Sequence, residues 1–157
     1  MRVQSVVCLR PDRWPRARFL SATAKGADRL AYAASSALAK LVVDEPESVA
    51  LERYLQRGPV ALISSRIAVV EVTRTAILSN PALREEADAL LATCLLVDVG
   101  APILQRAAEL ASARLRSLDA IHLATALDVE PDEMIVYDDR LVEAAAAVGL
   151  RTTSPGR

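Results

Sequence analysis

Short apolar runs alternate with helical patterns along the chain from residue 30 onward. Compact apolar runs are typical of buried strands, whereas apolar residues spaced three and four apart indicate helices. The predicted strands are residues 30–34, 60–63, 95–99, 134–137 and 150–153. The predicted helices are residues 35–43, 47–57, 81–93, 102–113, 117–127 and 139–148. Another helix is predicted to follow Ser64 or Ser65 and to end at about Ser79. Serines at helix starts are the expected caps, namely Ser35 or Ser36, Ser64 or Ser65, and Ser117.

The order of these elements predicts the fold class. Strands separated by helices pair in parallel and carry helices on both faces of their sheet. We therefore predict an α/β protein, a three-layer α/β/α sandwich with a central parallel sheet. The chain has 157 residues, of which 52% are hydrophobic, so residues 30–157 can form a single domain with a buried core. No apolar run reaches the length of a membrane span.

Charge is distributed unevenly between the two ends of the chain. Residues 1–29 carry seven basic and two acidic side chains, whereas the remainder carries 12 basic and 18 acidic ones. Pro11 and Pro15 interrupt the first segment, which lacks the apolar core of a secretory signal. We expect residues 1–29 to be a disordered extension, derived from an upstream start codon or the expression vector. A nucleic-acid-binding arm is the alternative, based on the basic charge.

The two cysteines give no sign of a metal site or a disulfide. Cys8 and Cys94 lie far apart and belong to no CxxC or Cys/His pattern. Structural zinc usually requires four clustered soft ligands. The sequence therefore predicts free thiols in a reducing compartment, which indicates a cytoplasmic protein.

Three acidic side chains and one alanine mark the predicted site. Open parallel sheets bind ligands beyond the carboxyl ends of their strands. Ala34 and Asp138 lie at such strand ends. Asp119 is expected in the first turn of the helix that begins at Ser117, and Glu71 about two turns into the helix after the second strand. Clustered carboxylates persist mainly where a cation neutralises them, and oxygen ligands alone favour Mg²⁺ or Mn²⁺. This chemistry indicates phosphodiester hydrolysis.

Four segments resemble the PIN-domain ribonucleases of the VapC toxin type. They are AYAASSALAKLVVDEPES at residues 31–48, SRIAVVEVTR at 65–74, SLDAIHLATAL at 117–127 and VYDDRL at 136–141. In the first segment, the family strand ends in aspartate followed by small polar residues and leucine. The resemblance extends from residue 30 nearly to the end of the chain, with the motifs in the family's order and spacing.

The resemblance implies roles for individual residues. Asp119 and Glu71 correspond to metal-ligand acids, and Asp138 to the fourth acid of the pocket. Ser36 matches a small polar position that supports the site. Ala34 stands where the family has its first metal-ligand aspartate. An alignment shifted by one residue would place Ala33 or Ser35 there, and neither carries a carboxylate.

Other polar residues near these motifs have simpler interpretations. His122 follows Asp119 by about one helical turn, and we expect it to be packed or hydrogen-bonded rather than a general base. Asp139 and Asp132 are expected at the surface, although Asp139 could support the metal indirectly. Arg74 and Arg140 could orient the acids or contact RNA phosphate, or form ordinary surface ion pairs.

The resemblance implies a Mg²⁺-dependent endoribonuclease toxin of a VapBC-type module, with Mn²⁺ as a possible substitute. It also implies a VapB-like antitoxin, an RNA substrate, a homodimer, and a groove for the antitoxin along residues 47–57. We expect Ala34 to leave this chain nearly inactive, whether the alanine is engineered or natural. The alternative is a non-catalytic PIN fold that binds and titrates an antitoxin.

Two other α/β classes fit less well. A response-regulator receiver needs a late lysine, but the lysines here are Lys25 and Lys40. A dinucleotide-binding domain needs a glycine-rich turn after its first strand. No such turn follows residue 34.

Overall fold

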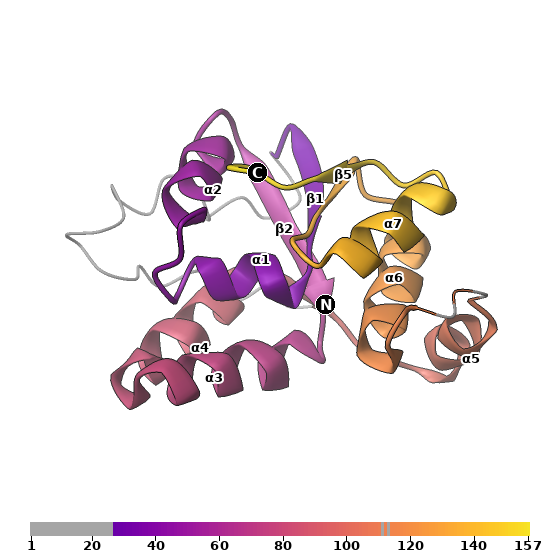
Figure 1. The fold of residues 1–157 in the computed structure, drawn as a ribbon, viewed down its shortest axis with the longest axis horizontal. Coiled ribbons are helices and arrows are strands. Elements are labelled where there is room, and N and C mark those ends of the chain that lie inside the picture. The colour runs from indigo at the N-terminus through magenta and orange to yellow at the C-terminus, as the bar shows by residue number, and fades with distance from the viewer. Residues whose placement is uncertain (1–26, 111, 113) are drawn as a thin grey trace.

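The computed structural model describes residues 27–110, 112 and 114–157 (Figure 1). Residues 1–26, which hold most of the predicted extension, lie outside the described part. The elements follow the order β1 (Arg29–Ala33), α1 (Ser35–Lys40), α2 (Ser48–Leu55), β2 (Val60–Ser65), α3 (Ala68–Ser79), a 3-10 turn (Pro81–Leu83), α4 (Arg84–Thr93), β3 (Leu95–Val97), α5 (Ala101–Glu109), α6 (Ser117–Val129), β4 (Glu133–Ile135), α7 (Asp139–Ala147) and β5 (Thr152–Thr153).

The five strands form one parallel sheet in the order β3-β2-β1-β4-β5. β1 lies at the centre and pairs with β2 on one side and with β4 on the other. The strands fall within a few residues of the predicted ranges, and the predicted α/β fold with helices flanking a parallel sheet is confirmed. Among the described residues, no helix is long and apolar enough to cross a bilayer.

Alternating residues of β1 bury two separate apolar cores. Ala31 and Ala33 pack with the buried faces of α1, α2, α3 and α4, whereas Tyr32 packs with α6 and α7 on the opposite face. This alternation follows from the two-residue period of a strand. Figure 1 shows the two helix groups on opposite sides of the central strands. The large side chain of Tyr32 therefore points toward α6.

The predicted serine cap of α3 is wrong. β2 continues through Ser64 and Ser65, which are completely buried, and the residue that precedes α3 is Ile67. The Ser64 hydroxyl donates a hydrogen bond to the carbonyl of Ala33 in the neighbouring strand (2.7 Å). The Ser64 hydroxyl is thus satisfied within the sheet rather than at a helix start.

The other two predicted serine caps are also displaced by one residue. Ala34 is the N-cap of α1 and Arg116 is the N-cap of α6, and neither side chain accepts a capping hydrogen bond. Ser35 and Ser117 are instead the first helical residues. Alanine is a poor N-cap because it has no acceptor for the free N–H groups of the first turn. The start of α1 therefore lacks the side-chain cap that Asp138 gives to α7.

Candidate functional site

The predicted site residues lie at the carboxyl edge of the sheet. Ala34 follows β1 directly, and Asp138 follows β4 after two intervening residues. Glu71 lies in the first turn of α3, and Asp119 lies in the first turn of α6. Parallel strands place their carboxyl ends at one edge, so segments distant in sequence converge here.

Glu71 is held by two polar side chains from other elements. The hydroxyl of Ser35 donates to Oε2 of Glu71 at 2.6 Å, and Nε2 of His122 lies 2.8 Å from the same oxygen. Ser35 Oγ and His122 Nε2 are themselves 2.8 Å apart. Burial acts to raise the pKa of Glu71, but the hydrogen bonds from His122 and Ser35 outweigh it and hold this pKa below its ordinary value. Glu71 is therefore ionised at neutral pH.

His122 is buried and connects Glu71 to the sheet. Its Nδ1 atom lies 2.7 Å from the hydroxyl of Tyr32, and that hydroxyl accepts the backbone N–H of Ser65 at 3.1 Å. The two rings meet edge to face, with centroids 5.9 Å apart. Burial raises the pKa of Tyr32 well above its ordinary value, so the phenol remains protonated. The expectation that His122 is packed and hydrogen-bonded agrees with these contacts.

Asp119 experiences the negative charge of the other acids. Burial raises its pKa above the ordinary value, and the charges of Asp138 and Glu71 raise it further, against an opposing effect of His122. Asp119 therefore lies within electrostatic range of both Asp138 and Glu71. Such repulsion in the folded state is typical of functional sites.

We expect Asp119→Asn to stabilise the fold at neutral pH. An acid whose pKa is raised by folding destabilises the native state when it is ionised, and the penalty fades as pH falls toward the unfolded pKa near 4. Thermal unfolding of both proteins at pH 7 should give the higher Tm for the variant. The difference should shrink as the buffer is taken toward pH 4. A lower Tm at pH 7 would contradict the electrostatic interpretation.

Asp138 has a structural task as well as its place in the site. Its Oδ1 accepts the backbone N–H groups of Arg140 and Leu141 at 3.0 and 3.1 Å and so caps α7. Its Oδ2 lies 3.5 Å from the Arg140 guanidinium. Burial acts to raise the pKa of Asp138, but the hydrogen bonds from Leu141 and Arg140 outweigh it and lower this pKa. Both carboxylate oxygens of Asp138 thus face protein donors.

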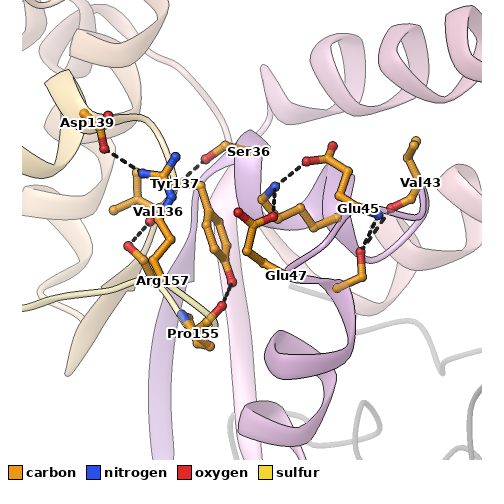
Figure 2. Close-up of polar contacts among 12 residues, drawn as sticks. Ser36, Val43, Glu45, Glu47, Val136, Tyr137, Asp139, Pro155 and Arg157 are labelled. Atoms are coloured by element: carbon orange, nitrogen blue, oxygen red, sulfur yellow. Dashed lines mark hydrogen bonds and ion pairs between the residues drawn. The ribbon is translucent and has the colours of Figure 1, made fainter.

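The segment before Asp138 is fixed by contacts with α1 and with the C-terminal residues (Figure 2). Ser36 Oγ accepts the backbone N–H of Tyr137 at 3.0 Å. The Tyr137 hydroxyl donates to the carbonyl of Pro155, and Arg157 pairs with Asp139 at 2.6 Å. Ser36 therefore reaches the strand end beside Asp138 rather than Glu71.

Two cationic side chains lie near the ring of Tyr137. The Lys40 ammonium lies 4.8 Å from the ring centroid and is paired with Glu45 and Glu47. The guanidinium of Arg157 lies 6.0 Å from the same centroid. Burial acts to lower the pKa of Lys40, but its two glutamate partners outweigh it and raise this pKa. Lys40 and Arg157 thus both contact the ring beside Asp138.

Ala34 lies between these two groups of contacts. The next residue, Ser35, contacts Glu71, and the residue after that, Ser36, contacts the strand end beside Asp138. Ala34 is 1% exposed and presents only a methyl group. In the part of the chain that the structure describes, no three His, Cys, Asp or Glu side chains are arranged to hold a metal ion. The residues present therefore do not form a complete metal site.

Sequence reasoning placed the acids but did not predict the two partners of Glu71, which are Ser35 and His122. It assigned the supporting role to Ser36, and it did not single out Tyr32, the partner of His122. One signal was available for His122, because a residue three positions after Asp119 lies on nearly the same helix face. Tyr32 is the only aromatic residue of its strand. The predicted surface acid Asp139 is exposed, and Arg74 is exposed on α3.

Comparison with known proteins identifies the class to which this arrangement belongs. Residues 32–147 match the family model of the PIN domain. The crystal structure of Mycobacterium tuberculosis VapC20, described as a Sarcin-Ricin loop cleaving toxin, superposes with a TM-score of 0.62 at 16% identity, over 80% of this chain and 99% of that one. The fold and the family match together define a PIN-domain protein.

Sequence similarity to curated relatives identifies the group within that class. Ribonuclease VapC46 of M. tuberculosis is 42% identical over 127 residues, which are 79% of this chain and 96% of the relative. Ribonuclease VapC47 of the same species is 36% identical over 132 residues, or 80% and 96% of the two chains. The chain belongs to the VapC ribonuclease family of PIN-domain proteins.

Proposed function

We propose that this chain is a VapC-type endoribonuclease toxin whose catalytic centre lacks the first of its four acids, at residue 34. The proposal is supported by the positions of Glu71, Asp119 and Asp138 near strand ends and helix starts at the carboxyl edge of the sheet, where burial and the charges of Asp138 and Glu71 raise the pKa of Asp119. Ala34 follows the central strand at this same edge and caps α1 without a side-chain acceptor. An aspartate fits both requirements, since it is a favoured N-cap and a hard oxygen ligand.

The cofactor that we propose for the sequence with aspartate at residue 34 is Mg²⁺, with Mn²⁺ as a substitute. The donor set of acids, without His or Cys ligands, suits a hard divalent ion. Asp119, Glu71, Asp138 and the restored acid would be its candidate ligands. With alanine at residue 34 the set is one charge short, so we propose that this chain is catalytically impaired.

The test is cleavage of structured RNA in the presence of Mg²⁺ by Ala34→Asp, beside the unmodified chain. Restored cleavage that EDTA abolishes would support the proposal. Cleavage by the variant no faster than the background would show that residue 34 is not the missing acid position. Sequencing the RNA ends from an active variant would then identify the substrate.

A second function is favoured by the lack of a metal-binding cluster in the described residues. The chain would then be a non-catalytic PIN protein that binds and titrates an antitoxin. Calorimetric titration with Mg²⁺ separates the two functions. We expect Ala34→Asp to bind the ion measurably more tightly than the unmodified chain. A pure binding protein would gain no affinity from the restored acid.

The partners follow from family membership and are part of the proposal. They are a VapB-like antitoxin, an RNA substrate and a second copy of the chain, in the cytoplasm. We propose that the antitoxin contacts α2, where Val49 is exposed while Leu51 and Leu55 are buried in the core. The free thiol of Cys94 is compatible with a reducing compartment. Residues 30–157 would constitute the functional domain.

A further inference from the structure

A chain of hydrogen bonds leads from the end of β2 to the carboxylate of Glu71. Its links are Ser65 N–H to the Tyr32 hydroxyl, the Tyr32 hydroxyl to His122 Nδ1, and His122 Nε2 to Glu71 Oε2. Tyr32 is 0% exposed and His122 is 2% exposed. The four residues lie on β2, β1, α6 and α3, so the chain connects the sheet with a helix from each of the two layers.

The distances along this chain are consistent with one assignment of donors and acceptors. A distance of 2.8 Å between a ring nitrogen and a carboxylate oxygen requires a proton between the two atoms. We assign this proton to Nε2 of His122, which then donates to Glu71 Oε2. In the tautomer with its proton on Nε2, Nδ1 is bare and accepts a hydrogen bond. The Tyr32 hydroxyl, which already accepts the Ser65 N–H, supplies that hydrogen.

This arrangement gives the two oxygens of Glu71 different environments. Ser35 and His122 both donate to Oε2. Among the described residues, none donates a hydrogen bond to Oε1, and the Glu71 side chain is 27% exposed. One oxygen is therefore bound to the protein while the other remains available at the acidic edge of the sheet.

We propose that Tyr32 and His122 are positioning residues that hold Glu71 with Oε2 bound by protein donors, which leaves Oε1 available as a ligand. The inference rests on the proposed function in one respect, because it takes Glu71 as an acid of the site. Some residues hydrogen-bond to a metal ligand without binding the metal themselves, and replacing them typically changes the metal affinity by ten- to a hundredfold. Tyr32 and His122 need not touch the ion or the RNA to have this effect.

The first test observes the imidazole directly. His122 is the only histidine in the chain, so ¹⁵N-histidine labelling gives the signals of a single ring. At neutral pH we expect a proton on Nε2 and a bare, hydrogen-bonded Nδ1. Tyr32→Phe should move the Nδ1 resonance toward that of a nitrogen without a donor, while Nε2 stays protonated. A proton on Nδ1 in the unmodified chain, or an Nδ1 resonance that Tyr32→Phe leaves unchanged, would overturn the inference.

The second test measures Mg²⁺ binding by calorimetry in the Ala34→Asp background. Adding Tyr32→Phe should weaken the affinity ten- to a hundredfold. Tyr54→Phe is the matched control, because its hydroxyl donates to the buried Glu133 near the opposite end of the sheet. Equal affinities in the two double variants would overturn the positioning role.

The two tests separate the inference from the proposed function. If Ala34→Asp binds no Mg²⁺, the proposed function fails, and the ¹⁵N signals of His122 alone decide whether the hydrogen-bond chain exists. If those signals do not show the hydrogen bond from Tyr32 while Ala34→Asp binds Mg²⁺, the inference fails and the proposed function stands. Phenylalanine keeps the ring that fills the space between β1 and α6, and thermal unfolding verifies that each variant is folded.

Discussion

Replacing Ala34 by aspartate is expected to accelerate Mg²⁺-dependent RNA cleavage by at least about a hundredfold. A misplacement of about 1 Å in a catalytic site can cost that much in rate, and a missing ligand leaves a bound cation poorly positioned. The new carboxylate would cap α1 by accepting N–H groups of its first turn. It would also face the repulsion that already raises the pKa of Asp119. The rate of cleavage of a labelled structured RNA at saturating Mg²⁺ is the measurement.

Two variants control for effects other than the added charge. Ala34→Asn has nearly the size and the capping ability of aspartate but no charge, and we expect it to cleave at the background rate. The double variant with Ala34→Asp and Asp119→Asn should lose most of the restored activity, because it again lacks one acid. Cleavage by Ala34→Asn as fast as by Ala34→Asp would mean that capping of α1, not the carboxylate, restores the enzyme.

Much of the fold could be predicted because the strands and helices have different apolar periods. The central runs at residues 30–34 and 60–63 are short and apolar, and they form β1 and β2 within two residues of the predicted limits. The capping serines could not be predicted reliably. A serine after an apolar run can cap a helix or extend the strand, and the choice depends on which polar groups the neighbouring strand presents. Ser64 finds the carbonyl of Ala33, which lies 31 residues earlier.

The acids of the site could be placed from sequence, whereas their hydrogen-bond partners could not. Glu71, Asp119 and Asp138 are marked by their positions near strand ends and helix starts. The partners of Glu71 come from α1 and α6, which are 36 and 51 residues distant in sequence. Only the packing of both helices around the sheet selects Ser35 and His122 over neighbouring polar residues. The choice between Ser35 and Ser36 depends on the direction in which each hydroxyl points.

A buried acid, Glu133, lies near the end of the sheet opposite the acidic edge, and the sequence did not single it out. Glu133 is 1% exposed, and its Oε2 accepts the hydroxyls of Tyr54 and Thr153, each at 2.6 Å. Its Oε1 lies 3.1 Å from the Arg29 guanidinium, which stacks on the Tyr54 ring at 4.8 Å. Glu133 thereby connects β4 with β1, β5 and α2. In sequence, it is an ordinary acid beside an apolar run.

Replacing Glu133 by alanine is expected to destabilise the fold by about 3 kcal/mol. Removal of one partner from a buried ion pair typically costs about 3–5 kcal/mol, and we expect the lower end because Arg29 is 27% exposed and can turn toward water. Urea unfolding gives the free energy directly. For a domain of this size, the same change corresponds to a fall in Tm of roughly 6–12 °C.

Glu143→Ala is the matched control for this change. Glu143 also pairs with an arginine, Arg114, at 3.0 Å, but both side chains are at least 65% exposed. Such surface pairs contribute about 0–1 kcal/mol, so this variant should unfold almost as the unmodified chain does. Equal losses in the two variants would show that Glu133 is not the buried anchor of the sheet. Because Glu133 lies away from the acidic edge, Glu133→Ala in the Ala34→Asp background should leave the cleavage rate per folded molecule unchanged.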